Sequence, residues 1–361
     1  MKFSLSREAI LKPLQLVVGV VERRQTLPIL SNVLLSLDGQ RLSMTGTDLE
    51  VEIVGVTAIS ELGEDGDVTV SARKLVDICR SLPDGAKLDF SSSDGKAMIK
   101  SGRSKFTLAT LPANEFPSVD EGDKAVDFMV SGSIIKRLIE STSFAMAQQD
   151  VRYYLNGMLW ELKDNNLRAV ATDGHRLVKL FKEDYKSDSF VGDIVVPKKF
   201  LSYLSTFLSN DDILLSIGET HMTATIKQDT IISRTINEVF PDYESVIPTD
   251  NTKILKVDKK SVLGAIRRVS IFSNKSTHQV AFNISKDSFI IHTEDPESSS
   301  RAKEEIVGEY EGEDLIIGYN GEYLKDVINH VSGDSVVIKL NTPISATLFT
   351  GSEEEETKTM L

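Results

Sequence analysis

The chain has a single cysteine, Cys79, among its 361 residues, so no disulfide can form within it. A lone cysteine fits a reducing compartment, and on an amphipathic helix it is most often a small buried apolar residue. Long apolar runs are missing too, since none reaches the ~20 residues that span a bilayer. The first residues, MKFSLSREAI, lack the apolar core of a signal peptide. We therefore expect a cytoplasmic protein.

Signatures of catalysis and cofactor binding are also missing. The sequence has no phosphate-binding G-x-x-x-x-G-K-[ST] loop, no G-x-G-x-x-G motif and no G-x-S-x-G elbow. The five histidines include no H-x-x-x-H pair that would indicate a metal site. One stretch, Asp173-Gly174-His175-Arg176, resembles an active-site cluster, but no nucleophile accompanies it. We expect no metal, no cofactor and no enzymatic activity.

The net charge of −13 argues against a protein that coats nucleic acid by charge alone. The charge is unevenly distributed over six segments with helical periodicity, which are 7–22, 72–81, 132–147, 197–208, 258–270 and 320–331. These helices hold fourteen Lys and Arg against seven acids, a net +7, so the rest of the chain carries −20. Basic helices on acidic sheets would let one surface hold a polyanion. Lys and Arg are also good helix formers, which explains the count equally well.

What the chain does have is one structural pattern repeated three times. Each copy reads as a helix, a β-hairpin that ends in a tight turn, a β-branched run, a second helix and another hairpin. The turn holds Thr47-Asp48 in the first copy, Thr172-Asp173 in the second and, at a similar place, Thr293-Glu294 in the third. Landmarks of the first two copies keep an offset near 125 residues. The sequence therefore predicts three similar domains.

The predicted domains span residues 1–122, 123–250 and 251–361. Each has a normal domain size and contains two amphipathic helices among many short strands. This pattern predicts an α+β fold in which two helices cover one face of largely antiparallel sheet. Within the second domain we expect Ser133 to cap the first helix. We also expect strands over 153–162 and 167–180, joined at 164–166.

Several long motifs resemble one family. They are SFAMAQQDVRYYLNGM (143–158), ATDGHRL (171–177), TLPILSN (26–32), MTGTDLE (44–50), SGRSKF (101–106) and FPDY (240–243). All of them resemble the bacterial sliding clamp, the β subunit of the replicative DNA polymerase III. The resemblance runs from residue 1 to about 350. It implies a processivity factor without catalysis, which binds double-stranded DNA regardless of sequence and tethers polymerase III core, the clamp loader and repair proteins.

The family's architecture would explain basic helices on an acidic chain. Its members are head-to-tail homodimers that close six domains into a ring, with twelve helices lining the hole. By this resemblance, the residues that match DNA contacts are Arg24, Gln149, Tyr153 and Tyr154. Further charges expected to line the hole are Arg73, Arg80, Arg137, Lys198 and Lys199. Without the resemblance, Tyr153 and Tyr154 would be assigned to the core of a strand.

The resemblance also implies a partner-peptide cleft and a dimer contact. Cleft residues would be Thr172, Gly174, His175, Arg176, Leu177, Pro241, Val246, Ile344, Ala346 and Met360. There, short peptides would dock Leu and Phe side chains. The dimer would pair a basic edge with an acidic one, through Lys74, Ile78, Leu82, Arg103, Lys105 and Phe106 of one chain and Ile271, Phe272 and Glu304 of the other.

The sequence departs from the family at two cleft positions. The family ends in an apolar strand with two methionines, whereas this chain ends in EEEETKTML, and Met360 and Leu361 could supply part of the missing wall. Ser245 stands where a basic cleft residue is usual. Both departures concern partner affinity more than the ring.

Two other functions compete with the clamp. One is an enzyme with Asp173 and His175 as catalytic residues, and the other is a repeat scaffold that never meets DNA. Loss of a turnover in His175→Ala would favour the enzyme. DNA retention unchanged by charge reversal of Arg24, Arg137 and Lys198 would favour the scaffold.

Overall fold

The computed structural model describes residues 1–21, 27–59, 61, 63–119, 126–163, 166–182, 191–208, 210–352 and 357–361. Within these residues, no helix is long and apolar enough to cross a membrane.

Six α-helices occur in the described chain, two in each predicted domain. They are α1 (Arg7–Val18), α2 (Ala72–Ser81), α3 (Gly132–Thr142), α4 (Lys198–Phe207), α5 (Lys259–Ser270) and α6 (Gly321–His330). Three begin at side-chain caps, because Ser6, Asp258 and Asn320 each accept a hydrogen bond from a first-turn amide. All six predicted helices are present, but α1 ends at Val18 and α3 at Thr142, four and five residues before the predicted ends.

The strands of the first copy are β1 (Lys2–Ser6), β2 (Asn32–Asp38), β3 (Arg41–Thr47), β4 (Val51–Ala58), β5 (Gly66–Ser71), β6 (Lys87–Ser93), β7 (Lys96–Ser101) and β8 (Ser104–Leu111). Those of the second are β9 (Val126–Ser131), β10 (Gly157–Lys163), β11 (Asn166–Thr172), β12 (Leu177–Lys182), β13 (Gly192–Pro197), β14 (Asp212–Ile217), β15 (His221–Ile226) and β16 (Asp229–Arg234). Those of the third are β17 (Lys253–Asp258), β18 (Gln279–Ser285), β19 (Ser288–Asp295), β20 (Ser300–Ile306), β21 (Gly308–Glu311), β22 (Leu315–Asn320), β23 (Ser335–Leu340), β24 (Leu348–Gly351) and β25 (Thr357–Met360). The hairpin pairs β2–β3, β6–β7, β7–β8 and β10–β11 run antiparallel, as strands joined by short turns do.

Two local predictions are wrong. The helix α3 begins at Gly132, so Ser133 lies inside its first turn and is not the cap. Residues Tyr153–Asn156 form a 3-10 helix, and the strand begins only at Gly157. The reason is a closed loop, because the Asn156 amide bonds both the backbone N–H and the carbonyl of Asp150, at 2.9 and 2.8 Å. The predicted junction at 164–165 lies outside the described residues.

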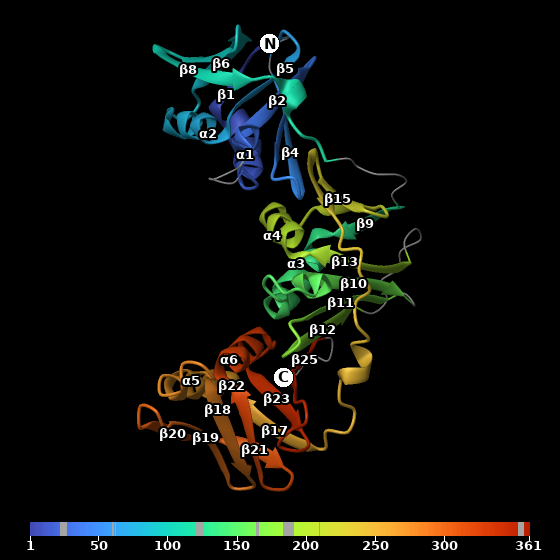
Figure 1. The fold of residues 1–361 in the computed structure, drawn as a ribbon, viewed down its shortest axis with the longest axis vertical. Helices are drawn as coiled ribbons and strands as arrows, with labels where there is room; N and C mark the ends of the chain where they lie inside the picture. Colours follow the sequence, from blue (N-terminus) through green and yellow to red (C-terminus); the bar gives the residue numbers. More distant parts are fainter. Residues whose placement is uncertain are drawn as a thin grey trace. The chain divides into compact units, whose positions relative to one another are not determined.

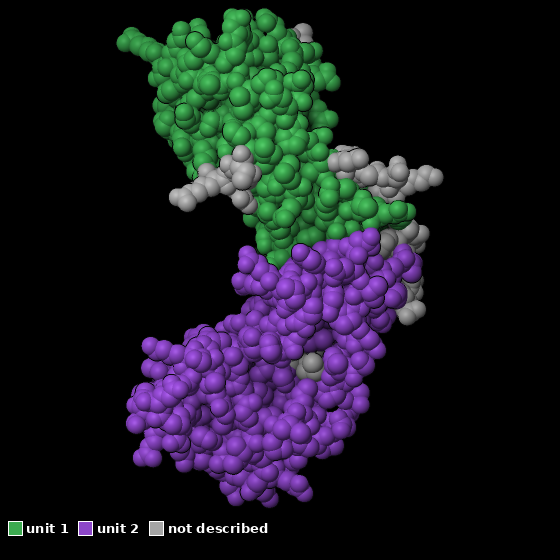
Figure 2. All heavy atoms as spheres, in the orientation of Figure 1, with its two compact units in different colours: residues 1–136, 188–190, 197–235 green, residues 137–187, 191–196, 236–361 purple. Residues whose placement is uncertain are grey.

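The chain divides into two compact units, drawn in two colours in Figure 2. Unit 1 holds a twelve-stranded sheet in the order β1-β6-β7-β8-β5-β2-β3-β4-β16-β15-β14-β9. Within it, α1 and α2 lie side by side against the sheet (Figure 1). Gly55 on β4 allows the close approach of α1, since a Cβ there would meet the Pro13 carbonyl oxygen at 2.9 Å. Strands of the first and second copies thus share one continuous sheet.

Unit 2 holds a nine-stranded sheet in the order β13-β10-β11-β12-β25-β24-β23-β17-β21 and a four-stranded sheet in the order β20-β19-β18-β22. Helices α5 and α6 cover a buried apolar cluster between these sheets that includes Phe282, Phe349 and Ile338 (Figure 1). In this unit, strands of the second and third copies share the nine-stranded sheet.

The strand that leaves the central turn is β4 in copy one, β12 in copy two and β20 in copy three. The last strand is β8, β16 and β25 in the same order. Inside the chain, β4 pairs with β16 and β12 pairs with β25. Each domain junction therefore joins the turn strand of one copy to the last strand of the next.

Candidate functional site

The central turn of the first two copies has the same hydrogen bonds. The Asp48 Oδ1 atom accepts from the backbone N–H groups of Glu50 and Val51, at 3.0 and 2.9 Å. The Asp173 Oδ1 atom accepts from those of His175 and Arg176, at 2.9 and 3.0 Å. Each aspartate thus fixes its own backbone turn and leaves its second oxygen for an ion pair.

At the first junction this second oxygen meets Lys199, the second residue of α4. The Lys199 Nζ atom lies 2.6 Å from Asp48 Oδ2 and 3.0 Å from Glu50 Oε2. Burial of the ammonium group lowers the pKa of Lys199, but the hydrogen bonds and charges of the two carboxylates more than offset it, so the pKa lies above its ordinary value. Lys199, a predicted DNA contact, is therefore engaged in joining two domains of unit 1.

At the second junction the cation lies on the turn itself. Arg176 is 9% exposed, and its guanidinium lies 3.2 Å from Asp173 Oδ2 and 2.7 Å from Asp326 Oδ2 on α6. It also donates to the Phe144 carbonyl at 2.8 Å and lies 4.7 Å from the ring centre of Tyr323. Arg176 is thus held within the second domain by Asp173 and the Phe144 carbonyl, and it reaches the third domain through Asp326 and the ring face of Tyr323.

The neighbouring His175 is exposed, and its ring stacks on Tyr323 with 5.7 Å between ring centres. The Asp173 carboxylate is engaged by backbone N–H groups and by Arg176, and none of its described hydrogen bonds goes to the His175 ring. The aspartate therefore acts as a turn cap, which gives no support to the alternative of a catalytic Asp–His pair.

The remaining cleft residues lie on strands and loops of unit 2. Leu177 is buried and pairs with Met360 across β12 and β25, although the side chain of Met360 lies outside the described residues. The next residue, Leu361, exchanges two backbone hydrogen bonds with Thr347 and packs on the third-domain core. Two predicted cleft residues are apolar and face solvent, namely Val246, which is 53% exposed, and Ile344, which is 97% exposed. Thr172 is buried, Ala346 is half-buried, and Gly174 and Pro241 are exposed.

Two residues at this turn were not singled out from the sequence. Tyr323 lies under both His175 and Arg176, and Arg152 lies against Gly174, where an added Cβ would meet its guanidinium at 3.3 Å. Tyr323 is 148 residues from His175 and 147 from Arg176 in sequence, so only the fold brings it here. The signal for Arg152 was present, since it belongs to the motif 143–158.

The predicted DNA contacts are spread over both units. Gln149 and Tyr153 are exposed, and Tyr153 keeps 66% of its surface. Tyr154 is half-buried and packs edge-on against Phe240, with ring centres 6.3 Å apart. On the helices, Arg73, Arg80 and Arg137 are exposed and Lys198 is half-buried. Arg24 lies outside the described residues.

Among the predicted dimer contacts, Glu304 has a partner within its own chain. This carboxylate is held by Arg268 of α5, with 2.9 Å between Nε and Oε2, so it is compensated within its own chain. Lys74, Arg103 and Lys105 are exposed, Ile78 and Phe106 are half-buried, and Leu82 is buried. Ile271 and Phe272 expose 76% and 45% of their surfaces, which is unusual for large apolar side chains.

Comparison with known proteins gives the same result for each copy. Family models of the DNA polymerase III beta subunit match residues 1–120 (N-terminal domain), 129–242 (central domain) and 244–361 (C-terminal domain). The beta sliding clamp of Pseudomonas aeruginosa is 44% identical over 358 residues, covering 99% of this chain and 97% of that protein. The beta sliding clamp of Pseudomonas putida is 46% identical over 97% of this chain and 95% of that protein.

Solved structures agree. The crystal structure of the Pseudomonas aeruginosa polymerase III subunit beta superposes with a TM-score of 0.97 at 43% identity, over 100% of this chain and 99% of that chain. A second structure from that organism, bound to griselimycin, superposes with a TM-score of 0.95 at 43% identity over 100% and 98%. The predicted three tandem clamp domains are confirmed, as is a function without catalysis, since clamps tether polymerases and transform no substrate. This chain therefore belongs to the family of the DNA polymerase III beta subunit, the beta sliding clamp.

Proposed function

We propose that two copies of this chain close head to tail, in the cytoplasm, into a six-domain ring that encircles duplex DNA. The observation that carries this proposal is a repeated junction, seen twice within the chain and left open at both ends. Strand β20 has β19 on one side only, and residues 104–109 of β8 pair with β7 on one side only, within the described residues. These are the turn strand and the last strand of a third junction.

The register of this third junction follows from the first two. At the first, the residue across from Thr47 is Glu52, which faces Ile232, the fourth residue of β16. At the second, the residue across from Thr172 is Leu177, which faces Met360, the fourth residue of β25. At both junctions, the residue across from the turn threonine faces the fourth residue of the last strand of the next domain.

The hairpin register identifies the third-copy residues. Counted from the β18–β19 hairpin, Glu294 occupies the position of Thr47, and the residue across from it is Arg301. The fourth residue of β8 is Thr107. Arg301 of one chain should therefore face Thr107 of the other, and Ala302 should face Phe106. Both members of each pair then lie on the same face of the sheet, as the pleat requires.

The charges of the turn support the same contact. Asp295 holds the place of Asp48, and Arg73 holds the place of Lys199 as the second residue of its helix. An Asp295–Arg73 pair between chains would thus repeat the Asp48–Lys199 pair within the chain. This assignment moves Arg73 from the DNA surface toward the subunit contact.

The exposed side chains of Ile271 and Phe272 also fit the proposed contact between subunits. Ile271 lies twelve residues after the start of α5, as Phe144 does after the start of α3. Phe144 stacks on His330 of α6, with 3.9 Å between ring centres, and packs on the next domain's core. By the same rule Ile271 would meet the end of α2 in the other chain, near Ile78 and Leu82. An open hollow of about 340 Å³ lined by Ile271 and Phe272 is available there.

The proposed ring would contact DNA weakly through the exposed helix cations and slide, because phosphate contacts carry no sequence information. Arg80, which is exposed, serves this role better than Lys199, whose charge is held by Asp48 and Glu50, and Arg137 and Lys198 remain proposed contacts. Polymerase III core, the clamp loader and repair proteins would be tethered by short peptides at the β12–β25 region. There the exposed Val246 and Ile344 offer apolar contacts and His175 and Tyr323 a ring wall.

A pair of cysteines tests the ring through its register. Arg301→Cys with Thr107→Cys places both thiols directly opposite across the proposed seam, within disulfide reach. On oxidation, the chain should become a covalent dimer of twice 39.9 kDa under denaturing conditions. The matched control, Arg301→Cys with Ala109→Cys, keeps the same face but shifts one thiol two residues, to ~7–8 Å, and should stay monomeric. Equal linkage of both pairs, or of neither, would refute the register.

The same variant tests DNA encirclement. When it is oxidised with nicked circular DNA, the linked ring should remain on the circle at high salt and leave when the circle is cut. Salt removes phosphate contacts but leaves a topological link in place. A scaffold that never meets DNA would show no retention on the circle at all.

A further inference from the structure

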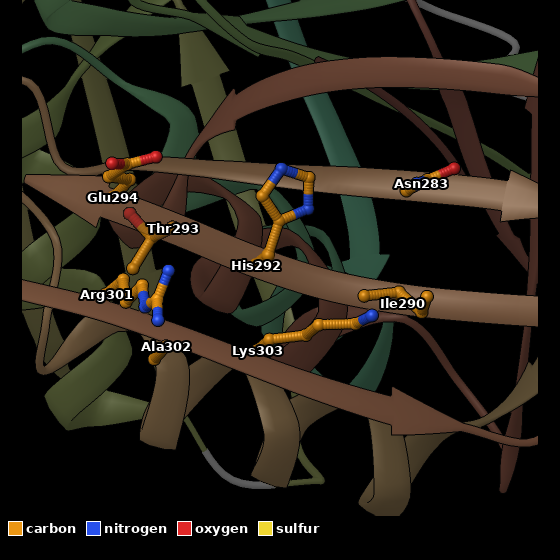
Figure 3. Close-up of a pocket in the computed structure, with 8 residues that line it drawn as sticks. All are labelled: Asn283, Ile290, His292, Thr293, Glu294, Arg301, Ala302 and Lys303. Carbon is orange, nitrogen blue, oxygen red and sulfur yellow. The ribbon is translucent and has the colours of Figure 1, made fainter.

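The third domain holds a basic hollow beside the proposed subunit seam, on the face of the β18–β20 sheet that points away from α5. It has a volume of about 490 Å³ and is lined by residues of β18, β19 and β20. Figure 3 shows His292, Lys303 and Arg301 projecting into it from neighbouring strands. Among the described residues, no hydrogen bond or ion pair engages the Lys303 ammonium or the Arg301 guanidinium. The two cations are therefore available to a ligand.

The acids around this hollow do not neutralise it. Glu294 lies directly across from Arg301, but no ion pair forms between them. Glu305 lies on the same face as Lys303, and its carboxylate accepts a hydrogen bond from the Ser288 hydroxyl at 2.6 Å. Glu304 points to the other face and is held by Arg268. His292, directly across from Lys303, adds an imidazole that can donate a hydrogen bond.

The register proposed for the subunit seam brings more cations to this hollow. If Arg301 faces Thr107 of the other chain, Lys303 faces its Lys105. Within that chain Lys105 lies directly across from Lys100. One row across five strands would then read Asp89, Lys100, Lys105, Lys303 and His292 on one face, with the single acid at the end away from the seam. Like charges directly opposite on neighbouring strands destabilise their pairing.

We propose that this row is a binding site for a multivalent oxyanion of the phosphate class, completed by the second copy of the chain, so that the bound anion strengthens ring closure. This inference rests on the proposed dimer. The ligand would be held by ammonium groups from both chains and by His292, and it would remove the repulsion between Lys303 and Lys105. The seam would thus tighten when the anion binds and loosen when it leaves.

The test is the dimer dissociation constant, measured by sedimentation in chloride and in millimolar inorganic phosphate at equal ionic strength. We expect phosphate to lower the constant of the native chain at least several-fold. Lys303→Glu places opposite charges across the seam and should tighten the dimer in chloride. The expected gain is about fivefold per seam, or about 25-fold for a ring with two seams. It should also abolish the phosphate effect.

The control is Lys286→Glu, which makes the same charge change on an exposed turn of the same sheet. This variant should keep the native phosphate response, because Lys286 lies outside the proposed row. Phosphate that acted only as a general salting agent would instead act on all variants alike. If a dimer forms but phosphate acts equally on the native chain and on Lys303→Glu, the anion site is refuted and the ring stands. If no dimer forms under any condition, both proposals fail together.

Discussion

Replacement of Arg176 by alanine should loosen the junction between the second and third domains. The guanidinium is nearly buried and serves Asp173, Asp326 and the Phe144 carbonyl at once. A hydrogen bond to a charged group is worth ~1.5–3 kcal/mol, and breaking a buried ion pair by removing one partner costs ~3–5 kcal/mol. Asp173 keeps its backbone donors and Asp326 is 48% exposed, so both are partly solvated after the change. The lower end, about 3 kcal/mol, is therefore expected.

Hydrogen exchange of α6 is the appropriate assay, because a chain of several domains does not unfold in one step. Only the Asp326 and Tyr323 contacts reach the third domain, so the α6 amides should exchange faster by at most roughly 150-fold, which corresponds to ~3 kcal/mol. Helix α2 in unit 1 should exchange as before. Arg176→Lys keeps the charge but loses the planar guanidinium, so its α6 exchange rate should lie between those of the native chain and of Arg176→Ala. Unchanged α6 exchange in Arg176→Ala would refute the role of Arg176 as the connector of these domains.

Three further predictions concern single residues. Lys199→Met leaves the nearly buried Asp48 carboxylate uncompensated, so β16 amides should exchange faster at a cost of ~3 kcal/mol. Because the pKa of Lys199 is raised in the folded chain, the ammonium group should contribute fully to the free energy of unfolding below pH ~10. The difference in stability between the native chain and Lys199→Met should therefore be constant between pH 6 and 9, and a change over that range contradicts this account. Burial raises the pKa of Cys79 to about 11, so its thiol should react slowly at pH 8 until the chain is unfolded. The unfolded thiol ionises near pH ~8.5, so stability should fall as the pH rises from there toward 11. Phe106→Asp should abolish the dimer and leave the fold intact, as circular dichroism would show, whereas Ile316→Asp, at an exposed position of β22, should keep both the dimer and the fold.

Much of the fold follows from the sequence because the three copies confirm one another. Apolar periodicity placed all six helices, and the predicted turn at Asp173 is confirmed. The strand expected at Tyr153 was wrong because a local polar loop, closed by Asn156, outweighs the β-propensity of two tyrosines. Local competition of this kind cannot be judged from hydrophobic pattern alone.

The sites were harder to predict, because face and pairing depend on register. The sequence placed Thr293-Glu294 at the turn position, but the hairpin puts Asp295 in the place of Asp48, one residue later. A slip of one residue exchanges the two faces of a strand. On β20, Glu304 points to Arg268 of α5, while Arg301 and Lys303 lie on the opposite face of the strand. The partners of Arg176, 32 and 150 residues away, are set by the fold.

The most direct test of the proposed ring is small-angle scattering of the purified chain in moderate salt, on an absolute mass scale. We expect a mass twice the 39.9 kDa of the chain and a profile that only a hollow particle fits. A compact particle with the mass of one chain would contradict the third junction and the closure of the ring.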